Sequence, residues 1–353
     1  MNIHAFSLTA FGLLTLIPAG LSPGCKTGRE YPAVTESVYY RVMFYNVENF
    51  FDTRDDSLTT DGDFTPQGAL HWNTSRYHTK LENLYKTVIA LGGWQPPDII
   101  GICEVENRYV LSDLVNHTPL SKYPYRIVHD DSPDRRGIDV ALVYNSKTVN
   151  LLQGTYFNIN SPGLITREIL YFKALIHRDT CHFLVNHWPS RSAGQLRTDP
   201  DRLSAAKRLR SVVDSLFTTT KNAKIVIVGD FNDEPQDESL SAGLRAGQDL
   251  RDPRHALLYN LSIAPEAGKF RGTVKYRGRW SMFDQVIVSG SLLLKNGGLR
   301  VQPDGYKIFG PSFLLMDDEQ FNGTRPFRTY NGYKYLGGFS DHLPVYVDLF
   351  VGN

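Results

Sequence analysis

The sequence has few cysteines and no excess of charge of either sign. Three cysteines in 353 residues are too few to imply a disulfide framework, and Cys103 and Cys181 lie in apolar, strand-like segments that predict buried thiols. The 38 Lys and Arg against 37 Asp and Glu give a formal net charge of +1, which excludes a strongly basic domain but leaves room for a local basic patch. With 41% hydrophobic and 12% aromatic residues, the chain is long enough to bury a sizeable core.

The first 25 residues differ from the rest of the chain. Residues 5–21 are apolar and small, but the stretch is short and interrupted by Gly and Pro, which does not suit a membrane span. We interpret residues 1–25 as a signal for export, although the first four carry no Lys or Arg. Cys25 follows Gly24 as in a bacterial lipoprotein processing site, so a lipid anchor at Cys25, plain secretion and an unprocessed terminus all remain open. Residues 26–38 predict a tether, and residues 39–353 a single domain.

Strand-like segments outnumber helical ones by about two to one after the tether. Apolar residues at helical spacing predict helices over residues 76–91 and 200–217, with Asp199 as the N-cap of the second. Strands are expected at residues 138–144, 169–176, 224–229, 283–289 and 343–350. Residues 169–176 and 181–185 predict a hairpin. The pattern favours an α/β fold of two mixed sheets with helices outside, rather than a doubly wound parallel sheet.

Four apolar runs end in polar residues of a kind that performs chemistry. Their polar ends are Asn46, Glu104, His187 and the pair Asp230 and Asn232. Strand ends are where α/β proteins usually place their sites, so one shared polar cavity is expected. Glu104 and Asn46 offer the carboxylate and amide oxygens that Mg²⁺ prefers. Taken alone, Glu104 fits a helix N-cap or a surface acid equally well, and His187 fits a packed core histidine.

The C-terminal third adds a second group of candidates. Asp341 and His342 lie in a loop before the last strand, where the carboxylate suits a metal and the imidazole suits a phosphate or a proton. Asp284 interrupts an apolar strand, and a buried carboxylate there needs a partner, for which His342 is the natural choice. Asp139 is predicted to orient His187, or else to be exposed. Ser-Asp-His is also a common loop sequence.

These segments together resemble the endonuclease/exonuclease/phosphatase superfamily, of the deoxyribonuclease I-like kind. The similarity runs in order from Arg41 to the C-terminus through seven short motifs: Asn46; Cys103-Glu104-Val105; Arg136-Gly137-Ile138-Asp139; Asn186-His187; Gly229-Asp230-Phe231-Asn232; Phe283-Asp284; and Ser340-Asp341-His342-Leu343-Pro344. Each motif is short, but their ordered set is specific. The resemblance implies a four-layer α/β/β/α sandwich with a Mg²⁺-dependent phosphoesterase site, in which Mn²⁺ is a substitute ion.

The resemblance also implies roles for the matching positions. Glu104, Asn46 and Asp341 are expected to bind the metal, with Asp341 bound directly or through water. Asp230 and Asn232 align the attacking water and the phosphate, and His187 donates to a non-bridging oxygen. His342 with Asp284 forms a dyad that acts either as general base or as phosphate clamp. The implied reaction is in-line attack of water on phosphorus without a covalent intermediate.

Two segments bear on the substrate. Residues 268–280 contain five cations, three aromatics and no acid, so Arg271, Tyr276 and Trp280, together with Arg136, are candidate contacts for a nucleic acid. An exposed hairpin with its cations in water is the plainer reading. Residues 295–339 are rich in aromatics and Gly and are expected to form a wall or lid. The sequence segments around Asn46 and Glu104 look closest to exported bacterial nucleases of the superfamily.

The sequence therefore favours an exported, monomeric nuclease. A phosphatase or phosphodiesterase for a small phosphate ester or phospholipid head group stays open, although no apolar hairpin suited to membrane insertion is evident. A surface binding protein without catalysis is the third reading, and a membrane contact is expected only through a lipid at Cys25.

Overall fold

The computed structural model describes residues 38–159, 161–263, 270–295 and 297–352. The expected signal, Cys25 and nearly all of the tether lie outside these residues. Residues Ser37–Asn353 form one compact unit. No helix of the described residues is both long and apolar enough to cross a membrane.

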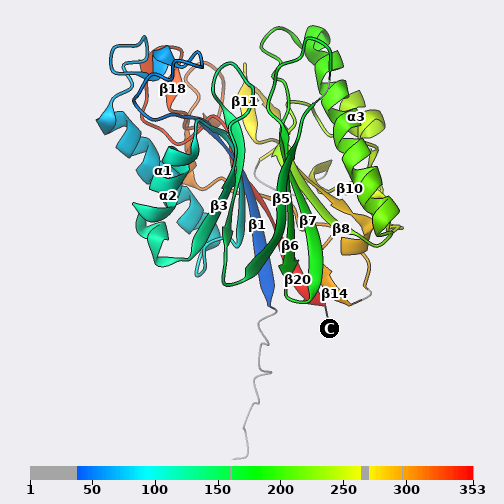
Figure 1. Ribbon diagram of the computed structural model, residues 1–353. Helices are drawn as coiled ribbons and strands as arrows, with labels where there is room; N and C mark the ends of the chain where they lie inside the picture. Colours follow the sequence, from blue (N-terminus) through cyan, green and yellow to red (C-terminus); the bar gives the residue numbers. More distant parts are fainter. Residues whose placement is uncertain (1–37, 160, 264–269, 296, 353) are drawn as a thin grey trace, which may run out of the picture. The chain divides into compact units, whose positions relative to one another are not determined.

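Two seven-stranded mixed sheets form the centre of the molecule (Figure 1). The first sheet has the order β14-β20-β1-β2-β4-β3, with β15 also paired to β20. Its strands are β1 (Tyr39–Phe50), β2 (Ile99–Val105), β3 (Tyr125–His129), β4 (Asp139–Asn145), β14 (Gly298–Arg300), β15 (Lys307–Ile308) and β20 (Val345–Gly352). Its two central strands, β1 and β2, run parallel, so their carboxyl ends meet at one edge.

The second sheet has the order β5-β6-β7-β8-β13-β10-β9. Its strands are β5 (Val149–Phe157), β6 (Ile169–Ile176), β7 (Asp179–His187), β8 (Lys224–Asp230), β9 (Ala246–Gly247), β10 (Leu258–Asn260) and β13 (Asp284–Ser289). The expected hairpin is present as β6 and β7, which pair antiparallel. In this sheet β7 and β8 are the central parallel pair, and His187 lies opposite Asp230 at their ends.

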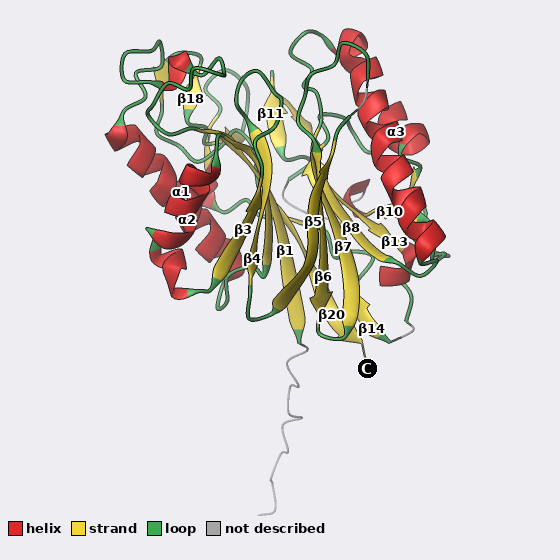
Figure 2. Ribbon diagram, viewed as in Figure 1, coloured by secondary structure: helices red, strands yellow, loops and turns green. Residues whose placement is uncertain are grey.

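Helices cover the outer face of each sheet (Figure 2). The first sheet carries α1 (Thr74–Gly92) and α2 (Arg108–Asn116), and the second carries α3 (Gln195–Thr219). The Asn73 side chain caps α1 by accepting from the Arg76 N–H, and the helix ends at Gly93 with a φ of 68°. The predicted N-cap Asp199 is wrong, because α3 begins at Gln195 and the Asp199 carboxylate pairs with Arg202 inside the helix.

Three apolar clusters follow from this layering. The central one fills the space between the sheets, and one outer cluster lies under α1 and α2 and the other under α3. Cys103 belongs to the central cluster, and both Cys103 and Cys181 are buried free thiols, as expected. The fold is the predicted four-layer α/β/β/α sandwich.

Three small hairpins complete the molecule. They consist of β11 (Val274–Tyr276) with β12 (Arg279–Ser281), β16 (Leu315–Asp317) with β17 (Thr324–Pro326), and β18 (Tyr330–Asn331) with β19 (Lys334–Tyr335). The first begins beside the Ser-Asp-His loop, since Val274 bridges to His342. The other two lie in the aromatic insertion of residues 295–339, which returns to the same edge of the sheets at Ser340.

Candidate active site

Strand alternation brings four of the predicted side chains onto the inner faces of the two sheets. On β8, Val226 and Val228 belong to the core between the sheets, and Asp230 follows at the same two-residue spacing. The same spacing continues from buried core residues to Asn46 on β1, His187 on β7 and Asp284 on β13. All four are at most 3% exposed. They meet where the core ends and the polar cavity begins.

Glu104 reaches the cavity by a different route. Cys103 lies in the core between the sheets and Ile102 in the outer core, so regular alternation would direct Glu104 toward the helices. Instead the pairing of β2 shifts between Cys103 and Val105, and Glu104 has a φ of 62°. The bulge turns the carboxylate inward, as bulges near active sites often do. A matching shift interrupts β1 after Asn46, where Glu48 and Asn49 also have positive φ.

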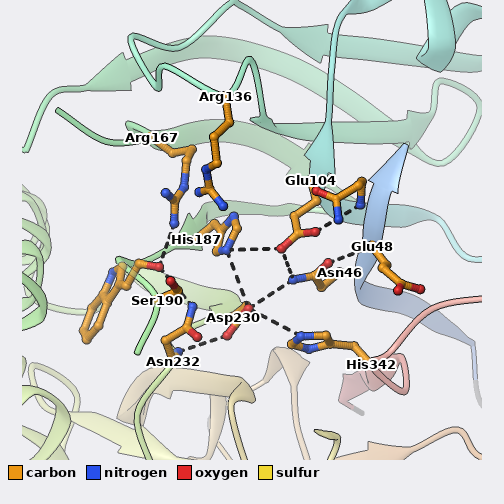
Figure 3. A network of polar contacts seen from close by, with 12 residues as sticks. Asn46, Glu48, Glu104, Arg136, Arg167, His187, Ser190, Asp230, Asn232 and His342 are labelled. Atoms are coloured by element: carbon orange, nitrogen blue, oxygen red, sulfur yellow. Dashed lines mark hydrogen bonds and ion pairs between the residues drawn. The ribbon is translucent and has the colours of Figure 1, made fainter. Parts of the chain in front are cut away.

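Asp230 lies at the centre of the polar network (Figure 3). Its Oδ2 accepts a hydrogen bond of 3.1 Å from Asn46 Nδ2, which also donates to Glu104 Oε1 at 3.1 Å. Nε2 of His187 lies 3.7 Å from this Asp230 oxygen and 3.7 Å from Glu104 Oε1. Nε2 of His342 approaches the same oxygen at 3.8 Å. Five side chains from both sheets and the last loop therefore converge on one point.

The two histidines differ in charge. Burial, with the charges of Arg167 and Arg136, holds the pKa of His187 well below its ordinary value, so the ring is neutral near pH 7. Burial also lowers the pKa of His342, but Asp284 and Asp230 outweigh it and the net pKa is well above the ordinary value. Nδ1 of His342 donates to Asp284 Oδ2 at 2.7 Å, which is the predicted dyad. Burial raises the pKa of Asp230.

Asp139 does not orient His187, so that prediction is wrong. Its Oδ2 is 2.8 Å from Nε2 of His129, and its Oδ1 accepts from the Ser132 N–H. The reason is register: His129 lies opposite Ala141, two residues from Asp139 and hence on the same face. Nδ1 of His187 is buried and has no hydrogen-bond partner among the described residues.

Asn232 and Asp341 are near the cavity but partly engaged elsewhere. The backbone N–H of Asn232 donates to Asp230 Oδ1, while its side-chain Nδ2 donates to the Trp188 carbonyl. Asp341 Oδ2 accepts from Arg328 Nη2 at 3.0 Å, and its Oδ1 lies 4.0 Å from Nε2 of His342. Asp341 therefore offers one oxygen to the cavity and gives the other to a guanidinium.

The donor set of the cavity fits a hard divalent cation. The Asn46 amide lies between Glu104 and Asp230 with Nδ2 toward both acids and with Oδ1 accepting from the Glu48 N–H, so it would offer its oxygen to an ion only after turning. Glu104 and Asp230 are carboxylates, and no Lys or Arg side chain in the described part of the chain lies within 4.0 Å of either acid. Such oxygen groups are what Mg²⁺ takes in proteins. Asp230, Asp284 and His342 also place one potential ligand atom each within 4.8 Å. Their closeness is explained by the Asp284–His342 pair.

A basic hollow adjoins the cavity beyond His187. It has a volume of about 420 Å³ and is lined by Arg135, Arg136, Arg167 and Thr166, among others. In Figure 3, Arg136 and Arg167 extend toward His187. Arg167 is 3% exposed and pairs with Asp134 at 2.8 Å, yet its Nε and the Thr166 hydroxyl have no partner among the described residues. Sequence reasoning missed Arg167, whose only signal is its position just before β6.

The first small hairpin carries the predicted substrate contacts Tyr276 and Trp280, and Arg271 precedes it. Tyr276 is exposed, as is Arg271, and Trp280 is half-buried with its ring 5.9 Å from that of Phe270. Not all cations of the segment are free for a ligand, because Lys275 forms a buried ion pair with Asp318 of the insertion. The insertion reaches the site through Arg328, which contacts Asp341 and Glu48. Arg328 and Glu48 were not singled out from the sequence.

Comparison with known proteins identifies the family and the fold. The family model described as "Endonuclease/Exonuclease/phosphatase family" matches residues 41–350. A search of curated proteins found no match. Similar solved structures include an endonuclease/exonuclease/phosphatase family protein of Bacteroides thetaiotaomicron, at 15% identity and a TM-score of 0.56 over 89% of this chain and 95% of that one.

Two further structures show the same fold. One is a mannosyl-6-phosphatase of B. thetaiotaomicron, with 18% identity and a TM-score of 0.55 over 88% of this chain and 99% of that one. The other is a humanized TDP2 of D. rerio, with 14% identity and a TM-score of 0.55 over 88% and 98% of the two chains. Because the family model spans nearly the whole described unit, the chain belongs to the endonuclease/exonuclease/phosphatase family.

Proposed function

We propose that this phosphoesterase is a Mg²⁺-dependent phosphodiesterase that acts on nucleic acid. The observation that carries the proposal is the basic hollow next to the catalytic cavity. Arg135, Arg136 and Arg167 line the hollow, and Asp134, which pairs with two of them, is its one acid, so an excess of positive charge remains. That charge suits an anion beside the scissile phosphate, which a polynucleotide has and a simple monoester lacks. The exposed Arg271 and Tyr276, in the segment whose Val274 bridges to His342, offer a cation and a stacking surface.

The side chains support in-line attack by water. His187, neutral and with Nε2 facing the cavity, donates to a non-bridging phosphate oxygen. His342, held as an imidazolium by Asp284, acts as a phosphate clamp rather than as a base. Asp230, whose pKa is raised by burial, accepts the proton of the attacking water. Glu104 and Asn46, with the free oxygen of Asp341, would hold Mg²⁺ or Mn²⁺, which would neutralise the charge that develops on the phosphate.

A hydrolysis panel tests this function. Plasmid DNA, single-stranded DNA, RNA, mannose 6-phosphate, inositol phosphates and sphingomyelin are offered with Mg²⁺, with Mn²⁺ and with EDTA. We expect cleavage of nucleic acid that EDTA and His187→Ala abolish, whereas His117→Ala, which changes an exposed histidine on the far end of α2, retains activity. Absence of nucleic-acid cleavage with every metal would refute the nuclease.

The alternative is a phosphatase or phosphodiesterase for a small ester. It is supported by the similarity to a mannosyl-6-phosphatase and by the insertion that reaches the site through Arg328. Hydrolysis of a small ester with nucleic acid left intact would establish it. If the protein binds metal but hydrolyses no phosphodiester or monoester, the result would support a binding protein without catalysis.

The basic hollow itself gives a sharper test. Arg136 is half-exposed, so Arg136→Gln is expected to raise KM for DNA and to reduce the salt dependence of binding by about one phosphate contact. Arg251→Gln, on an exposed arginine elsewhere, is the matched control. Equal KM values for the parent and Arg136→Gln on DNA would show that DNA does not bind in the hollow.

Export and a monomeric state remain proposals from the sequence. The apolar residues 5–21 and the Gly24-Cys25 pair support a signal for export, with a lipid on Cys25 as one form. Cell fractionation with mass spectrometry of the mature N-terminus distinguishes a lipidated Cys25, a secreted chain and an uncleaved one. Sedimentation of the purified protein reports its oligomeric state.

A further inference from the structure

The acids of the cavity fall into two groups that differ in their fixed positive partners. Glu104 and Asp230 form the first group. Their nearest ionisable nitrogens among the described residues are Nε2 of His187 and, for Asp230, Nε2 of His342, at 3.7–3.8 Å. No Lys or Arg side chain of the described chain lies within 4.0 Å of Glu104, so no guanidinium or ammonium pairs with it directly. This group needs an added ion.

Glu48 and Asp341 form the second group, and a guanidinium already lies between them. Arg328 Nε donates to Glu48 Oε1 at 3.4 Å, and Arg328 Nη2 donates to Asp341 Oδ2 at 3.0 Å. The other oxygen of Glu48 accepts from the Thr329 backbone N–H. Glu48 is 5% exposed, so an ionised carboxylate at this place requires such partners.

The segment that carries Arg328 is fixed by buried contacts from α1. Nζ of Lys80, which is 1% exposed, donates to the Thr329 hydroxyl and to the Phe339 carbonyl, both at 2.6 Å. Nδ2 of Asn83 donates to two further carbonyls of the same loop, those of Gly337 and Gly338. The guanidinium is therefore held in place rather than carried on a free surface side chain.

We propose that Arg328 stands in for a second divalent ion between Glu48 and Asp341, so that the chain binds one ion, at Glu104. Two carboxylates that face one another in a partly dry site attract a cation, and a guanidinium with two acceptors satisfies both. A divalent ion entering the same place would have to displace this bound charge or be repelled by it. The inference rests on the proposed function only for the presence of an ion at Glu104.

Counting bound Mn²⁺ by electron paramagnetic resonance, without substrate, tests this. The parent protein is expected to bind one ion per chain, and Glu104→Gln none at the same concentration. Arg328→Gln removes the charge and should raise the count to two. The double variant Glu48→Gln with Arg328→Gln loses one of the two carboxylates and should return to one, and Arg251→Gln should match the parent.

Two results would overturn the inference. One is a parent protein that binds two ions with comparable affinity, and the other is a folded Arg328→Gln that still binds one. If Arg328→Gln does not fold by circular dichroism, Arg328→Lys provides the comparison: it keeps one charge and should bind one ion, and a count of two would contradict the role of the charge. A parent that binds one ion but hydrolyses no phosphate ester would refute the proposed function and leave this inference standing.

Discussion

The Asp284–His342 pair shows, at the scale of residues, how one buried contact sets a chemical state. Asp284 is fully buried and its carboxylate keeps the His342 imidazole charged. In Asp284→Asn the shape remains but the charge is lost, so we expect kcat to fall by about 10²- to 10⁴-fold. Steady-state kinetics on the best substrate measure this, and bound Mn²⁺ should be unchanged. A kcat within twofold of the parent would show that the dyad is not catalytic.

His182 gives a pH dependence unrelated to the cavity. Burial, with the nearby charge of Lys173, lowers its pKa to about 4, and its Nδ1 pairs with the Tyr171 hydroxyl at 2.8 Å. Since an unfolded histidine has a pKa of about 6.5, the unfolded chain binds the extra proton first as pH falls. The contribution of neutral His182 is thus complete above pH 6.5 and lost between pH 6.5 and 4.

The expected loss is about 2 kcal/mol of unfolding free energy after a discount for solvent screening. Urea unfolding of the parent and of His182→Gln at pH 4 to 7 measures it, and the parent should lose more stability across this range than the variant. Parallel curves would mean that His182 is not perturbed in the folded state.

At the scale of elements, α1 serves as the anchor of the catalytic loop. Lys80→Met removes the donor to Thr329 and Phe339 and leaves those groups unpaired, which is expected to cost about 3 kcal/mol and to lower kcat by loosening Asp341. Lys86→Met, on the exposed face of the same helix, should change stability by less than about 0.5 kcal/mol. Urea unfolding and hydrogen exchange of residues 327–340 measure both. Equal effects of the two variants would contradict the anchor.

The strands and loops also show which site residues can be predicted from the sequence. Asn46, His187, Asp230 and Asp284 were predictable because each continues a regular two-residue alternation from core to cavity. Glu104 broke that alternation. The end of its apolar run and the resemblance both indicated the cavity, but the bulge that turns its carboxylate inward could not be predicted, since it depends on the pairing of two strands. Asp139 was misassigned because its partner, His129, lies across a strand register that sequence does not reveal. Arg328 depends on a long insertion whose path is set by α1.

At the scale of the whole molecule, Gly101 lies where side chains of the second sheet approach the first sheet closely. A Cβ at this position would meet Val228 and Val185 of the second sheet at 3.2 and 3.3 Å, and Phe44 of its own sheet at 3.2 Å. Gly101→Ala is expected to cost about 1 kcal/mol by overpacking and to lower kcat as well. Ile102→Val, on the outer face of the same strand, should cost about 1 kcal/mol without changing kcat. Identical kcat values in the two variants would show that the spacing of the sheets does not influence turnover.

Gly101→Ala is expected to lower kcat because the proposed catalytic groups lie on opposite sheets. Glu104 extends from the first sheet and Asp230 from the second, and the amide of Asn46 spans the gap between them. The width of that gap is fixed by the thickness of the apolar layer below it, about 10 Å between sheet backbones. The thickness of the core therefore sets the distance between the groups that act on the substrate. Hydrostatic pressure or a single added methyl group can retune the rate without altering any polar side chain.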